Sequence, residues 1–178
     1  MNNIDQFLKD LYSHSNSRGH YPMLKGLFGR SIGKQGLSDE YDELLDVTAA
    51  LLIKIHKDNS ILPSIIDTIF LRNREGLFTH DLIWAFFEAR DPYRLMLIAN
   101  YLYSDDPRDT KLARKLLNFV PSIDMTTSRD SKDKYMDFFY WLKENYPFLY
   151  FTGESFQRTS NPIPFKIDLD AKYEGASS

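Results

Sequence analysis

Apolar residues recur at three- and four-residue intervals along most of the chain, which is the spacing of an amphipathic helix. The pattern is clearest over residues 38–57, where Ser38 can cap the first turn. Acidic residues begin this stretch and basic residues end it, as the helix dipole favours. The same periodicity predicts helices over residues 3–14, 61–72, 79–87, 92–103, 107–119 and 131–145.

Two of these predicted helices begin alike, because Asp91-Pro92 and Asp106-Pro107 each place an aspartate at the cap and a proline in the first turn. Helices of about three to four turns with short connections pack as antiparallel neighbours. The fold class that we expect is mainly α, a compact multi-helix bundle or a short helix-pair stack with an extended or β C-terminal arm. The expected division is a helical domain over residues 1–152 and the arm over residues 153–178.

In the arm, apolar and polar residues alternate from residue 165 to 173, which predicts a strand with one apolar face. A single strand needs a partner for its backbone groups. Residues 149–151, the helical body, a second copy or another protein are the alternatives. The candidate partner-binding residues are the apolar positions of this strand and two aromatic residues beside the stripe of the preceding helix. They are Phe165, Ile167, Leu169, Tyr173, Tyr140 and Trp141.

Residues 15–37 show no clear periodicity, so we expect an irregular loop there. Between residues 18 and 34 every formal charge is positive and glycine recurs, so that backbone amides can approach an anion closely. A solvated loop, an anion or nucleic-acid contact and a protein-binding loop are the alternatives. The candidate anion-binding residues are Arg18, Lys25, Arg30 and Lys34.

The composition and charge of the chain exclude several kinds of site and partner. A net charge of -3 argues against a surface built for nucleic acid, although it leaves room for a local basic patch. The absence of cysteine excludes disulfides, thiol catalysis and cysteine-based metal sites. The four histidines have no zinc-binding spacing, and no nucleophile motif is present. We therefore expect no cofactor, no metal and no catalytic residue. A non-enzymatic protein is favoured over an enzyme.

The first residues lack the basic start and apolar core of a signal peptide, and no apolar run approaches the roughly 20 residues of a membrane span. We expect a cytoplasmic protein without membrane insertion. The predicted function is a non-enzymatic interaction, adaptor or assembly protein, with a protein partner or a homo-oligomer. The alternative is an anion or nucleic-acid binding module that uses the basic loop 18–34, with nucleic acid not favoured.

Overall fold

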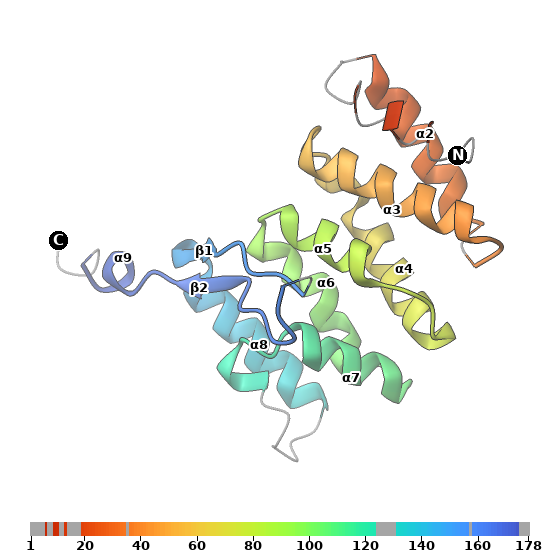
Figure 1. Cartoon of the computed structure of the whole chain (residues 1–178). Coiled ribbons are helices and arrows are strands. Elements are labelled where there is room, and N and C mark those ends of the chain that lie inside the picture. The colour runs from red at the N-terminus through yellow and green to blue at the C-terminus, as the bar shows by residue number, and fades with distance from the viewer. Residues whose placement is uncertain are drawn as a thin grey trace. The chain divides into compact units, whose positions relative to one another are not determined.

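The computed structural model describes residues 6, 9, 10, 13, 19–34, 36–123, 131–156 and 158–174 (Figure 1). The protein is mainly α-helical, and a two-stranded antiparallel sheet lies near the C-terminus, which confirms the predicted fold class. The chain divides into two compact units, Met1–Ala89 and Arg90–Ser178. The division into a helical domain 1–152 and an arm 153–178 stays a prediction. Most of the helix expected over residues 3–14 lies outside the described residues.

The N-terminal unit is built from helices alone in the part that the structure describes. Its elements are α2 (His20–Ile32), α3 (Asp39–Lys54), the 3₁₀ helix η1 (Asn59–Ile61), α4 (Leu62–Glu75) and α5 (His80–Glu88). The central helix α3 packs against α2 and α5. Its buried residues Leu45, Ala49 and Leu52 recur at helical spacing and carry the contact.

Residues 20–32 form the regular helix α2, so the prediction of an irregular loop over residues 15–37 is wrong for this segment. Leu24 and Phe28 are buried one helical turn apart, and α2 packs on α3. Gly26 and Gly29 lie at exposed positions of the same helix. The packed apolar face outweighs the cost of roughly 1 kcal/mol that each glycine imposes on a helix.

The C-terminal unit consists of shorter elements. They are η2 (Pro92–Arg94), α6 (Leu95–Ala99), η3 (Asn100–Tyr103), α7 (Pro107–Leu116), η4 (Pro121–Ile123), α8 (Ser131–Asn145), η5 (Tyr146–Phe148), β1 (Leu149–Phe151), β2 (Phe165–Ile167) and α9 (Leu169–Glu174). The helix α8 packs against η3, η4 and α6, and α7 packs against η3. The two Asp-Pro starts are confirmed, because Asp91 accepts a hydrogen bond from the N–H of Tyr93, and Asp106 accepts one from the N–H of Arg108.

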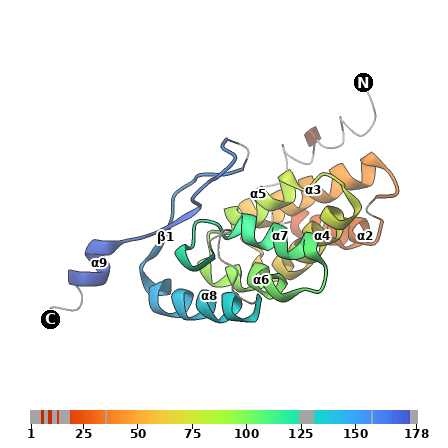
Figure 2. The same cartoon turned by 90° about the horizontal axis from the view of Figure 1, so that it is seen from below.

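The two strands β1 and β2 pair antiparallel, with Leu149 opposite Ile167 and Phe151 opposite Phe165. Residues 149–151 are thus the strand's partner, which was one of the predicted alternatives. The predicted strand over residues 165–173 is wrong beyond Ile167, because Leu169–Glu174 form the helix α9 (Figure 2). Asp168 starts that helix, since its carboxylate accepts a hydrogen bond of 3.0 Å from the Ala171 N–H.

Candidate functional site

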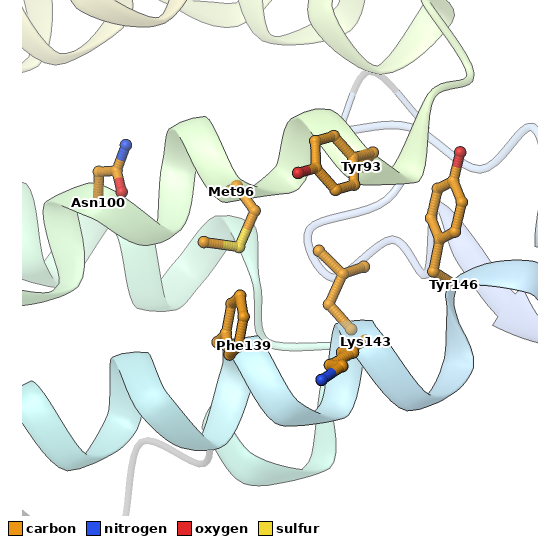
Figure 3. A pocket seen from close by; sticks show the side chains of 7 residues that line it. Tyr93, Met96, Asn100, Phe139, Lys143 and Tyr146 are labelled. Atoms are coloured by element: carbon orange, nitrogen blue, oxygen red, sulfur yellow. The ribbon is translucent and has the colours of Figure 1, made fainter.

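An open groove lies within the C-terminal unit (Figure 3). One wall is the segment of η2, α6 and η3, and the other is α8 together with the first residue of η5. The groove has a volume of about 690 Å³. Its lining residues are Tyr93, Met96, Asn100, Phe139, Leu142, Lys143 and Tyr146.

Two edge-to-face aromatic pairs connect the walls. The ring centroids of Tyr93 and Tyr146 are 5.7 Å apart, and those of Tyr103 and Tyr135 are 5.1 Å apart. The start of the first wall therefore meets the end of the second, so that the two walls run antiparallel. Such pairs contribute about 0.5–1.5 kcal/mol each beyond the area that they bury, and they fix the walls at both ends of the groove.

The first wall is apolar on two faces. Leu95, Ile98 and Leu102 are fully buried in the core of the unit. Tyr93 and Met96 lie on the other side and line the groove. Tyr93 is 60% exposed to solvent. A helical segment whose second face is also apolar is covered by something else in the functional state or marks an interaction surface.

The second wall repeats this arrangement on α8. Phe138 and Leu142 are buried, whereas Phe139 is 38% exposed and lies one helical turn from Lys143 on the groove side. Aromatic and methionine side chains are the residue types enriched in protein–protein interfaces. Of the described residues that line the groove, Lys143 alone carries a charge. The groove therefore suits an apolar segment with a negative charge at one edge.

The structure separates the predicted partner-binding residues into internal and exposed groups. Phe165 is buried beside Phe151, with ring centroids 5.7 Å apart, so it packs inside its own unit. Trp141 is half-buried beside Phe138. Tyr140 is exposed on α8 but does not line the groove.

The remaining three residues lie in the arm. Ile167 ends β2 and is half-buried. Leu169 and Tyr173 are 57% and 65% exposed on α9. These two exposed side chains stay available for an intermolecular contact.

Sequence reasoning missed the groove itself, because none of its lining residues was a predicted site residue. A pattern was present, since positions 93, 96 and 100 share one helical face, as do positions 139, 143 and 146. What was lacking was the knowledge that these two faces oppose each other, and only the tertiary structure supplies it.

The predicted anion-binding residues do not converge. Arg18 lies outside the described residues. Lys25 pairs with Asp58, and the ammonium of Lys34 lies 4.8 Å from the centre of the Tyr41 ring. Arg30 is exposed on α2. It follows Lys25 by five residues, so the two side chains point about 140° apart around the helix. An anion site on these residues stays a prediction, without a common cradle in the described segment.

Asp58 links α2 to η1, the 3₁₀ helix that directly precedes α4. Its carboxylate accepts hydrogen bonds from the Lys25 ammonium, the Tyr21 hydroxyl and the backbone and side chain of Ser60. Burial of Asp58 raises its pKa, but these hydrogen bonds outweigh burial and hold the pKa at about 2, below its ordinary value of 3.8. The cluster acts as a structural clamp, because every donor around the carboxylate is already engaged with it.

We expect Asp58→Ala to lower the free energy of unfolding by about 1–2 kcal/mol at neutral pH, because the cap and the ion pair are both lost. Urea denaturation measures the change. The pKa is depressed on folding, so the difference between wild type and variant should be full above pH 3.8 and shrink as the pH falls toward 2. Asp105→Ala, at an exposed aspartate, is the control and should stay within about 0.5 kcal/mol. An equal loss in both variants would contradict the clamp.

A second ionic cluster lies inside the N-terminal unit. Arg72 is 1% exposed, and its guanidinium bonds the carboxylates of Asp46 at 2.8 Å and Asp42 at 3.2 Å. Burial raises the pKa of Asp46 to about 7, and the charge of Arg72 offsets only part of this rise. The guanidinium of Arg72 also donates a hydrogen bond to the carbonyl oxygen of Phe78. The cluster joins α3 to α4 and to the segment before α5.

Within the described residues, no three histidine or acidic side chains gather closely enough to hold a metal ion. The helices in the described part of the chain are all too short or too polar to span a bilayer.

Comparison with protein-family models, curated proteins and solved structures finds no match to this chain. The structure itself defines the class of protein. It is a mainly α protein whose C-terminal unit carries an open apolar groove between two antiparallel helical walls.

Proposed function

We propose that the protein is a non-enzymatic interaction or assembly module, and that its groove binds an apolar segment of a protein. The observation that supports this most is the groove with exposed aromatic side chains on both walls, Tyr93 on one and Phe139 on the other. Binding an apolar segment would remove these rings from water, which stabilises the complex by about 25 cal/mol for each Å² of apolar surface buried.

The dimensions favour a helical segment. The first wall from Tyr93 to Tyr103 has eleven residues, and its ten residue steps cover at least about 15 Å at the rise of an α-helix. A ligand helix of two to three turns has this length, and helix-in-groove recognition uses apolar residues at three- and four-residue spacing. The strand β2, which the sequence put forward as the binding element, already pairs with β1. The proposal therefore moves the binding surface from the strand to the groove.

The alternative of anion or nucleic-acid binding has less support. This alternative required an irregular loop whose backbone amides and basic side chains could surround an anion. Residues 20–32 form a helix and not a loop. Backbone amides inside a helix are engaged in its own hydrogen bonds.

Phe139→Glu tests the proposal, because it places a charge in the groove at a partly exposed position where the fold tolerates it. Helical peptides selected from a display library against the full chain serve as probes, and fluorescence anisotropy measures their affinity. We expect the selected peptides to carry apolar pairs at i, i+4 and to bind Phe139→Glu at least about tenfold more weakly.

The matched control is Tyr140→Glu, which makes the same change of charge one residue along α8 but outside the groove. Its affinity should stay within about twofold of wild type. Peptides that bind Phe139→Glu as well as wild type would overturn the proposed function. Circular dichroism and thermal melting verify that both variants are folded.

A further inference from the structure

The helix α9 is held by its polar side and presents its apolar side to solvent. The ammonium of Lys172 donates to the carboxylate of Glu144 and to the side-chain oxygen of Asn145, both at 2.8 Å. Leu169 and Tyr173 are spaced i, i+4 on the same face and are both more than half exposed. An amphipathic helix normally buries this face, so α9 displays the kind of apolar stripe that the groove fits.

The helix cannot fill the groove of its own chain while these contacts hold. One residue, Asp168, connects β2 to α9, and its N–H donates to the carbonyl oxygen of Phe148 at 2.8 Å. Lys172 fixes the other end of α9 at the C-terminus of α8. Figures 1 and 2 both show α9 beyond that end of α8. The apolar stripe is thus available to a second molecule.

Charge complementarity favours a second copy as that molecule. On α9, Asp170 and Glu174 follow the apolar stripe by about 100° around the helix, so that both carboxylates flank the stripe on one side. Lys172 lies on the other side and is engaged with Glu144. Among the described residues that line the groove, Lys143 supplies the one charge, and it is positive. An apolar stripe with an acidic flank matches an apolar groove with a basic edge.

The arm and the groove also adjoin each other, as a two-fold symmetric exchange requires. Asn145 binds Lys172 of the arm, and the next residue, Tyr146, lines the groove. In an isologous dimer the same surface patch serves both partners, so that each arm can reach the other copy's groove across one axis. Each contact then occurs twice, which strengthens an interface built from a six-residue helix.

Resting on the proposed function of the groove, we propose that a second copy of this chain is its occupant. Leu169 and Tyr173 of each copy bind in the other copy's groove, and the acidic flank of α9 lies against Lys143. The chain therefore forms a two-fold dimer by reciprocal docking of its C-terminal arms.

Light scattering with size-exclusion chromatography on the full chain tests this dimer. Wild type should be dimeric, and the double variant Leu169→Ser/Tyr173→Ser should dissociate at least about tenfold more readily. Phe139→Glu should have the same effect from the groove side. Leu37→Ser, at an exposed leucine of the N-terminal unit, should leave the dimer unchanged.

Mixing the two monomeric variants distinguishes docking from a general loss of apolar surface. The arm variant keeps an intact groove, and Phe139→Glu keeps an intact arm, so that the mixture contains one of the two contacts and should form a heterodimer. A charge reversal gives a second measurement. Lys143→Glu should weaken the dimer, and Asp170→Lys/Glu174→Lys in the same chain should restore it.

A monomeric wild type, or a dimer insensitive to both the arm and the groove variants, would overturn the reciprocal docking. If helical peptides still bind the groove in a Phe139-dependent manner, only the choice of a second copy is wrong and the proposed function stands. If the peptides ignore Phe139→Glu as well, the proposed function fails too.

Discussion

Arg72→Met should lower the free energy of unfolding of the N-terminal unit by about 3–5 kcal/mol at pH 8. The guanidinium of Arg72 is buried and bonds two carboxylates and the carbonyl oxygens of Phe78 and Asp42. Methionine replaces the apolar stem of the side chain but none of these donors. The variant thereby leaves the carboxylate of Asp46, whose side chain is only 11% exposed, without its counter-charge.

Urea denaturation followed by tryptophan fluorescence measures this loss. The two tryptophans lie in different units, Trp84 on α5 and Trp141 on α8, so a Trp141→Phe background reports on the N-terminal unit. Arg30→Met, at an exposed arginine of α2 in the same unit, is the matched control and should change stability by about 0.5 kcal/mol or less.

A compensating variant identifies the cause of the loss. Arg72→Met/Asp46→Leu removes both charges and fills the space with apolar groups, so we expect it to recover much of the stability. Asp42 retains the backbone N–H of Gly36 as a donor and is partly solvated, so it does not need the guanidinium to the same degree. A double variant as unstable as Arg72→Met alone would show that packing, not the buried charge, determines the cost.

The stability that Asp46 contributes should fall by about 1.4 kcal/mol for each pH unit between pH 4 and pH 7. Burial raises the pKa of this carboxyl group from 3.8 to about 7 in the folded protein. Across that window the folded state holds a proton that the unfolded state has released. Raising the pH therefore favours unfolding, and over the whole window the effect is on the order of 4 kcal/mol.

Comparison with Asp46→Asn isolates this effect, because asparagine keeps an oxygen for Arg72 but does not titrate. Other groups titrate alike in both proteins, so the stability of wild type minus that of the variant should decline with pH from 4 to 7. The difference should be constant above pH 7, where the carboxyl group is ionised in both states. A difference that stays constant from pH 4 to pH 7 would contradict the raised pKa, because an aspartate with a pKa at or below 3.8 is already ionised in both states over this window.

The helical content was predictable from residues that act locally. Asp91 and Asp106 cap their helices as the Asp-Pro pairs indicate, and the periodicity of Leu45 and Leu52 follows the buried face of α3. The error at α2 arose from giving glycine more weight than the spacing of Leu24 and Phe28. Propensity differences of about 1 kcal/mol per residue are smaller than the burial of an apolar face, so packing decides.

In the arm, the alternation from residue 165 to 173 fits a strand, and the conformation depends on what each half contacts. Residues 165–167 pair with the backbone of β1. Residues 169–174 instead form a helix that is capped by the carboxylate of Asp168 and is bonded through Lys172 to the end of α8. Short segments have too little intrinsic preference to choose alone. The sequence thus located a distinct C-terminal element without determining its form.

The sequence by itself determined the mainly α class, the positions of most helices and the aromatic residues beside the apolar stripe of α8. Hydrophobic periodicity and capping are local, and each acts within about one or two turns of the chain. The tertiary structure decided that residues 93–100 and α8 oppose each other across a groove, and that α9 turns Leu169 and Tyr173 outward. Both facts depend on contacts between segments distant in sequence, which packing of the whole unit establishes and no local pattern encodes.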